Sequence, residues 1–289
     1  MTTPTTTPTT GSTSTDGTVA APSTATQASL YQQLRGHLAA LKLHTAAEHL
    51  PAVLDHAVTE QLSLTAALER LLALEVDATE ARRLAGRLRF ASLPTPATLE
   101  EFDYDAQPAA NRPLITELAT CRYLASATNV LLIGPPGTGK THLAVGLARK
   151  AAEAGYRTYF TSAADLAARC HRAAIEGRWA YTMRFFAGPT LLVIDELGYL
   201  PLPAEAASAL FQVVAQRYTK TSIILTTNRG VAAWGEILGD TVAAAMLDRL
   251  LHRSVVLNLD GDSYRLREHH ARTDTLRRAT TGNTRRPLS

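Results

Sequence analysis

Residues 134–141 read GPPGTGKT and follow the apolar run NVLLI at 129–133. A buried strand that ends in a glycine-rich turn, with Lys-Thr opening a helix, is the pattern of a P-loop. Glycines in such a turn let successive backbone N–H groups point at anionic oxygens, and the helix that follows adds the positive end of its dipole. The stretch therefore predicts a binding site for a nucleoside triphosphate.

Two side chains of this stretch have separate expected roles. Lys140 is expected to reach the β- and γ-phosphates, and the Thr141 hydroxyl is expected to bind Mg²⁺. The residues expected to contact the nucleotide are Gly134, Pro135, Pro136, Gly137, Thr138, Gly139, Lys140, Thr141 and His142.

The composition is that of a globular protein with no secretion or membrane signal. Hydrophobic residues make up 46% of the 289 residues, but no apolar run approaches the roughly 20 residues that span a bilayer. The N-terminus lacks the basic and apolar regions of a signal peptide. Cys121 and Cys170 lie far apart and match neither a disulfide framework nor a zinc site. We therefore predict a cytoplasmic protein with reduced thiols and no membrane partner.

Composition also divides the chain into four parts. Residues 1–29 are rich in Thr, Ser, Ala and Pro and are expected to be disordered. Residues 30–93 carry leucines at helical spacing, which predicts a small helical domain that binds DNA or a partner. Residues 94–268 are expected to form the nucleotide-binding domain. Residues 269–289 are expected to be a basic, flexible tail.

Within the helical region, Pro51 is expected to separate two helices, and Asp77 with Glu80 resembles a capping box that opens a third. Residues 97–110 are predicted to be an irregular connector. Pro113 then suits the first turn of another helix.

Downstream of the P-loop, apolar strand-like runs alternate with helical segments. This alternation predicts an α/β fold with a parallel sheet covered by helices on both faces. The expected strands are 129–133, 157–162, 191–196, 222–228 and 254–259, and the expected helices lie near 141–154, 163–175, 204–218 and 241–252.

An acidic pair ends the apolar strand LLVIDE at 191–196, as in a Walker B element. Asp195 is expected to hold Mg²⁺ through its water shell, and Glu196 to orient and deprotonate the attacking water. Asn228, at the end of the next strand, is expected to position that water against the γ-phosphate. An Asn that closes a strand before a turn would look the same, but its order and spacing after the acidic pair favour the catalytic role.

Three arginines follow in the C-terminal part. Arg249 and Arg253 are four residues apart and are expected to share a helix face. One of them suits an arginine finger that completes the site of a neighbouring subunit. Arg265 is placed to touch the phosphates of the same chain's nucleotide. Each of the two assignments also fits an ordinary surface charge.

Arginines also cluster in three other stretches. Clustered arginine favours a phosphate-backbone partner, although each cluster taken alone fits a solvated helix face or a flexible tail equally well. The residues expected to contact DNA are Arg82, Arg83, Arg87 and Arg89, with Arg169, Arg172, Arg178 and Arg184 second, and residues 267–289 add six further arginines.

Taken together, GPPGTGKTHLA, LLVIDELGYLP, the TTN strand, MLDRLLHRS and GDSYRLR resemble the IstB-like AAA+ ATPases. These are helper proteins of insertion-sequence transposition and relatives of the DnaC helicase loaders. The resemblance covers about residues 30–268. It implies an AAA+ fold that oligomerises on duplex DNA with ATP between subunits and then activates a DDE-type transposase. It also implies that Arg249 or Arg253 is the finger and that Arg265 is sensor 2.

The sequence therefore predicts a Mg²⁺-dependent ATP hydrolase that assists transposition. A replicative helicase loader on the same fold is the nearest alternative, and genomic context would separate the two. An ATP-assembled DNA scaffold with negligible turnover is an alternative of another class. The presence of both Asp195 and Glu196 argues against it, because a scaffold has no need of the second acid.

Overall fold

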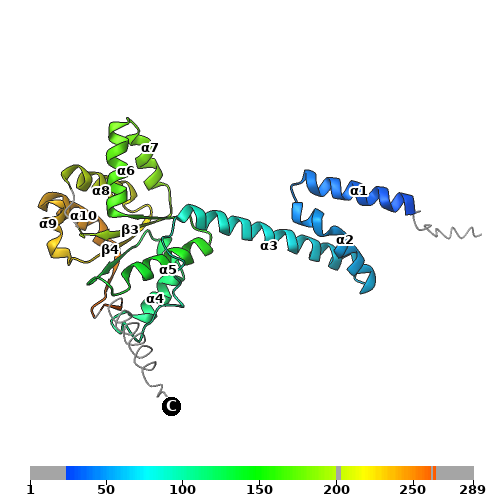
Figure 1. The fold of residues 1–289 in the computed structure, drawn as a ribbon, viewed down its shortest axis with the longest axis horizontal. Coiled ribbons are helices and arrows are strands. Elements are labelled where there is room, and N and C mark those ends of the chain that lie inside the picture. The colour runs from blue at the N-terminus through cyan, green and yellow to red at the C-terminus, as the bar shows by residue number, and fades with distance from the viewer. Residues whose placement is uncertain (1–23, 200–202, 262, 265–289) are drawn as a thin grey trace, which may run out of the picture. The chain divides into compact units, whose positions relative to one another are not determined.

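The computed structural model describes residues 24–199, 203–261, 263 and 264 of this chain (Figure 1). The chain forms two compact units, residues 1–80 and 81–289. The boundary lies inside helix α3 (Leu64–Ala91), whereas the composition placed it after Leu93. Among the described residues, no helix combines the length and the apolar character that crossing a membrane requires.

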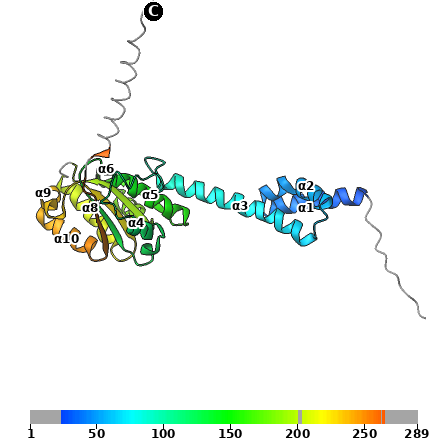
Figure 2. The same cartoon turned by 90° about the horizontal axis from the view of Figure 1, so that it is seen from below.

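The first unit is helical, as the leucine spacing indicated. Helices α1 (Thr24–Ala40) and α2 (His44–Thr59) pack against each other (Figure 2). Its small core includes Leu38 and Leu50. Leu43, the residue before α2, has no side-chain acceptor for the first N–H groups of that helix. The buried Glu75 carboxylate of α3 accepts the Ala46 N–H at 2.9 Å and so caps α2 from another helix.

Three local predictions in this unit were wrong. Helix α1 begins at Thr24, because residues 24–29 contain no Gly or Pro and the compositional bias hid their helical potential. Pro51 lies inside α2 rather than between helices, at the cost of one helical hydrogen bond. Asp77 starts no helix, because the Leu-, Ala-, Glu- and Arg-rich stretch around it keeps α3 continuous.

The second unit contains a five-stranded sheet in the order β2-β3-β4-β1-β5. All four strand pairs are parallel, which confirms the predicted α/β fold. Strand β1 lies between β4 and β5 and is buried at every residue. The strands are β1 (Asn129–Ile133), β2 (Thr158–Ser162), β3 (Leu191–Leu197), β4 (Ser222–Thr227) and β5 (Ser254–Asn258).

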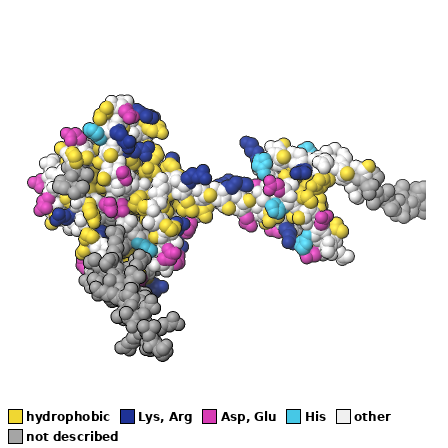
Figure 3. All heavy atoms as spheres, in the orientation of Figure 1, with side chains coloured by type: hydrophobic (Ala, Val, Ile, Leu, Met, Phe, Trp, Pro, Cys, Tyr) yellow, Lys and Arg dark blue, Asp and Glu magenta, His cyan; other side chains and the backbone are white. Residues whose placement is uncertain are grey.

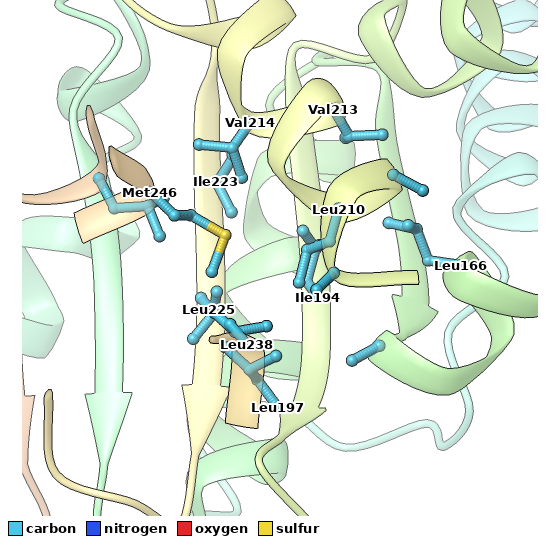
Figure 4. Close-up of a cluster of buried hydrophobic side chains, with 14 of the residues drawn as sticks. Leu166, Ile194, Leu197, Leu210, Val213, Val214, Ile223, Leu225, Leu238 and Met246 are labelled. Atoms are coloured by element: carbon cyan, nitrogen blue, oxygen red, sulfur yellow. The ribbon is translucent and has the colours of Figure 1, made fainter. Parts of the chain in front are cut away.

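Helices cover both faces of this sheet (Figure 1). One face packs its apolar side chains, such as Ile194 and Leu225, against Leu210 and Met246 of the covering helices (Figure 4). These helices are α6 (Ala163–Ile175), α7 (Trp179–Ala187), α8 (Ala204–Arg217), α9 (Trp234–Leu238) and α10 (Asp240–Leu251), with the short 3₁₀ turn η2 (Val231–Ala233) before α9. The sequence patterns missed α7 and α9, which are short and rich in aromatic or glycine residues of low helix propensity.

The other face carries α4 (Arg112–Ala119), the 3₁₀ turn η1 (Arg122–Leu124) and α5 (Lys140–Glu153), together with the connector before them. Helix α4 begins one residue before Pro113, with the Asn111 side chain accepting the Leu114 N–H at 3.0 Å. Both cysteines are free and buried, one in each cluster. Burial raises the pKa of Cys170 to about 11, so this thiol is protonated at neutral pH.

Candidate functional site: a P-loop at the carboxyl edge of the sheet

The P-loop leaves β1 and opens α5 with left-handed glycines. Gly137 and Gly139 have φ angles of +85° and +87°. A Cβ atom at Gly139 would lie 2.6 Å from the Phe102 ring, and one at Gly137 would overlap the Ser263 side chain. Both positions thus require glycine for conformation and for space. The Lys140 ammonium donates to the Pro135 carbonyl at 2.6 Å, so this side chain points back across the P-loop.

The two predicted Mg²⁺ ligands lie beside each other. The Thr141 hydroxyl donates to the Asp195 carboxylate, with oxygen–oxygen distances of 3.1 and 3.0 Å. Asp195 is buried at the end of β3. A hydroxyl and a carboxylate next to a phosphate-binding loop form the oxygen donor set that Mg²⁺ takes, with phosphate oxygens and water completing its shell. These residues fit the ion that the P-loop implies.

Glu196 follows in an unusual conformation. Its side chain is exposed, and its φ angle of +62° lies in the left-handed region. This conformation costs a residue with a Cβ atom about 1–2 kcal/mol. Its backbone N–H donates to the Thr226 hydroxyl of β4 at 2.9 Å. A strained non-glycine residue held by a neighbouring strand is common where a side chain must be aimed for chemistry.

A small cavity of about 40 Å³ brings the predicted catalytic groups together. Lys140, Thr141, Glu196 and Asn228 all line it, although they come from three different parts of the chain. The Asn228 Oδ1 atom is buried and has no hydrogen-bond partner among the described residues. A buried carbonyl oxygen without a partner is costly, so this atom suits a ligand or a water molecule in the cavity.

A larger cavity of about 310 Å³ also borders the P-loop. Its walls combine Gly137–His142 with Phe102, Gln107 and Tyr264. The Gln107 side chain is 5% exposed and donates to the Thr138 carbonyl at 3.3 Å, while its buried Oε1 atom has no partner in the part of the chain that the structure describes. The cavity thus offers an aromatic wall and a free acceptor next to the phosphate loop, which fits the base of a nucleotide.

His142 lies where the sequence placed it, but its ring also has a structural contact. Its Nε2 donates to the Thr98 carbonyl at 2.7 Å, and its ring packs edge-on against Phe102. It thereby ties the connector to the first turn of α5. The sequence patterns did not point to Gln107, because a polar residue in an irregular segment carries no periodic signal.

The two candidate finger arginines lie away from this cavity. Helix α10 ends at Leu251, so Arg253 lies past the helix and does not share a helix face with Arg249, contrary to the prediction. Arg249 donates to the Ala245 carbonyl at 2.7 Å, with its guanidinium 4.9 Å from the Phe211 ring centre. Arg253 is exposed and donates to the Ser126 carbonyl at 3.3 Å. Arg265 lies outside the described residues.

The candidate DNA-binding arginines differ in their surroundings. Arg82, Arg83 and Arg89 are exposed on α3, whereas Arg87 is partly buried and donates to the Ala152 carbonyl at 2.7 Å, near the end of α5. Arg178 pairs with Glu176 at 3.4 Å. Arg184 donates to the Ala180 carbonyl of its own helix at 3.3 Å. Arg87 therefore has a structural contact that the sequence did not predict.

A hollow of about 430 Å³ lies between α6 and α7. Three arginines line it, and Tyr181 on its wall is 58% exposed. Figure 3 shows Lys and Arg side chains gathered over these helices and along α3. The arginines of this hollow, which we call the α6–α7 basic hollow, are Arg169, Arg172 and Arg178.

These features define a nucleotide-binding protein of the P-loop class, with a parallel sheet, paired Mg²⁺ ligands and a second acid beside them. Residues 36–272 match the family model of the IstB-like ATP-binding proteins, and the chain belongs to this family.

Relatives of known sequence agree with this assignment. Over 229 residues the chain is 45% identical to a Geobacillus stearothermophilus protein that is named as an ATP-binding protein of insertion sequence IS5376. The match covers 79% of this chain and 91% of that protein. It is 42% identical over 232 residues to the corresponding protein of IS21 from Pseudomonas aeruginosa, covering 80% and 88% of the two chains.

Solved structures agree on the fold. The AMPPCP-bound DnaA of Aquifex aeolicus superposes with a TM-score of 0.51 at 22% identity, covering 60% of this chain and 53% of DnaA. The described sheet and helices thus have the AAA+ fold, as the sequence resemblance implied.

Proposed function

We propose that this chain hydrolyses ATP and uses the nucleotide to control an assembly on duplex DNA that assists the transposase of an insertion sequence. The observation that best supports hydrolysis is the cavity of about 40 Å³ in which Lys140, Glu196 and Asn228 meet. A cation, a carboxylate and an amide oxygen around one small space match the needs of a γ-phosphate and an attacking water.

Each group has one task in this scheme. Lys140 attracts the phosphate charge, and the free Asn228 Oδ1 accepts a hydrogen bond from the water and orients it. Glu196 takes the proton as the water oxygen bonds to the γ-phosphorus and the bond to ADP breaks. A Mg²⁺ ion held by Thr141 and Asp195 would neutralise charge that develops on the phosphate oxygens.

The position of Arg253, one of the two candidate finger arginines, supports an assembly with shared sites. The Asn129 N–H donates to the Arg253 carbonyl at 2.8 Å, so Arg253 lies at the amino end of β1. The P-loop follows the carboxyl end of this strand, which a rise of about 3.3 Å per residue places more than about 13 Å away. An arginine on the opposite edge cannot reach its own chain's phosphates, so in this proposal it serves the site of a neighbouring subunit.

For DNA contact, the α6–α7 basic hollow is our first candidate, and the exposed arginines of α3 are the second. This order reverses the one that the sequence suggested, because the Arg87 side chain of α3 already donates to the Ala152 carbonyl near the end of α5. Replacing Arg172 and Arg178 with Gln is expected to weaken duplex binding. The slope of log affinity against log salt concentration should become less steep by about two. Arg122→Gln is the matched control, since Arg122 is an exposed arginine on another surface. An unchanged salt dependence would eliminate this candidate.

The deciding experiment is steady-state ATP turnover with and without duplex DNA, for the native chain and for Glu196→Gln. We expect DNA to stimulate turnover and the variant to lose it by about 10²–10⁴-fold while it still binds DNA in the presence of ATP. Measurable DNA binding that requires ATP, but with negligible native turnover, would favour the scaffold. Turnover that ignores DNA, without ATP-dependent DNA binding, would favour remodelling of a protein partner, as in a helicase loader.

A further inference from the structure

Strand β3 contains a β-bulge at the two catalytic acids. Ile194 pairs with Leu225 and Leu197 pairs with Thr227, so Asp195 and Glu196 together lie opposite the single residue Thr226. A bulge of this kind leaves one residue out of the ladder and turns a side chain away from its regular direction. In a regular strand Glu196 would lie on the same face as Leu192 and Ile194, which are buried in the core. The bulge lets Glu196 line the cavity instead.

The Thr226 hydroxyl occupies the centre of this bulge. It accepts the Glu196 N–H at 2.9 Å and donates to the Asp195 Oδ1 atom. Thr226 is only 1% exposed. One buried hydroxyl therefore satisfies the backbone amide that the bulge removes from the ladder and also orients the carboxylate that faces Thr141.

We propose that Thr226 is a positioning residue for hydrolysis, and that its hydroxyl holds the metal-binding acid and the general base in register with each other. It acts through Asp195 and Glu196, because its proton already goes to one acid and it accepts the amide of the other. This inference rests on the proposed hydrolysis of ATP. The inference also explains how two acids that are adjacent in sequence can have different roles.

Loss of this hydroxyl has two separate consequences. Without it, the Glu196 N–H has no partner, and the left-handed conformation at φ +62° is no longer held. Asp195 also loses the donor that fixes its orientation toward Thr141. Removing the partner that orients a metal ligand typically lowers metal affinity or activity by about 10–100-fold.

The test compares Thr226→Val, which keeps the shape and removes the hydroxyl, with Thr226→Ser, which keeps the hydroxyl. Thr158→Val is the matched control, because Thr158 is a fully buried strand threonine of β2 whose hydroxyl donates only to the Tyr156 carbonyl. The measurements are kcat, the Mg²⁺ concentration that gives half-maximal rate, and the affinity for a labelled ADP with and without Mg²⁺.

We expect Thr226→Val to lower kcat by about 10–100-fold and to raise the half-maximal Mg²⁺ concentration, while its Mg²⁺-free nucleotide affinity stays within about threefold of native. Thr226→Ser should recover most of both losses, and Thr158→Val should match the native chain. If Thr226→Val does not fold, Thr226→Ala is compared with Thr226→Ser instead. Each variant is then measured at the same interval below its own melting temperature.

Native kcat and native Mg²⁺ dependence in a hydroxyl-free variant would overturn this inference and leave the proposed hydrolysis intact. A native chain without turnover would overturn the hydrolysis. In that case ADP binding still tests the orientation of Asp195. The gain in ADP affinity that Mg²⁺ gives should be smaller in Thr226→Val than in the native chain, and unchanged in Thr226→Ser.

Discussion

The two edges of the sheet hold their polar side chains in opposite ways. At the amino edge, the buried Arg217 donates to the carbonyls of Phe186, Pro189, Thr190 and Ser222, and its pKa is lowered by burial to about 9. At the carboxyl edge, the buried Asn228 Oδ1 atom has no partner within the described ranges, and Glu196 has a strained backbone conformation. At the amino edge, polar side chains bind backbone groups inside the fold. At the carboxyl edge, they lie beside cavities.

The difference follows from the direction of parallel strands. Turns at the carboxyl ends lead into helix N-termini, whose free N–H groups attract anions, so a binding site forms there. At the amino ends, buried carbonyls need donors and no ligand supplies them. The amino edge is not fully satisfied, since Arg217 Nε and the Ser222 hydroxyl lack partners among the described residues, but both lie in the packed interior.

The largest expected effect is at Arg217. Arg217→Met should lower the free energy of unfolding by about 3–5 kcal/mol, because three buried carbonyls and one partly buried carbonyl lose a charged donor. Denaturant unfolding measures the loss, and turnover per folded molecule should stay native. Lys220→Met is the control, since Lys220 is an exposed cation nearby. A loss below about 1 kcal/mol would contradict a structural role for the amino edge.

Asn129 should show the same behaviour with a smaller effect. Its side chain accepts the Ile223 N–H at 2.9 Å and donates to the Leu250 carbonyl at 3.0 Å. Asn129→Ala should therefore lower the free energy of unfolding by about 2–3 kcal/mol through two unpaired backbone groups. Thermal unfolding with and without ATP checks it. Reduced nucleotide affinity in the folded variant would break the proposed separation of the two edges.

The smallest expected effect on stability is at Asn228. Asn228→Ala should change the free energy of unfolding by less than about 0.5 kcal/mol, because the oxygen that it removes has no partner to lose. ATP turnover should nevertheless fall by at least about tenfold. Parallel unfolding and turnover measurements test both statements. Destabilisation as large as that of Asn129→Ala would mean that the two edges do not differ.

The strand pattern was predictable because each strand is a short apolar run next to a turn residue. Asn129–Ile133 is buried at every residue, and its uniform hydrophobicity reports that directly. Helices that cover the sheet, such as α5 and α8, were predictable as well. Local signals failed where the helix propensity of the surrounding residues outweighed a capping motif, as at Asp77 in the middle of α3, or where an element was too short to show a period, as in α7.

Sequence alone was enough to identify the P-loop, the acidic pair, the AAA+ fold and the family, because these depend on residue types at short, fixed spacings. Tertiary structure was needed to place Gln107 beside the P-loop, to assign Arg217 to the backbone of the amino edge, and to put Thr226 opposite the bulge. These roles depend on which strands and loops become neighbours and in what register. Hydrogen bonds between residues far apart in the chain leave no spacing in the sequence from which they could be read.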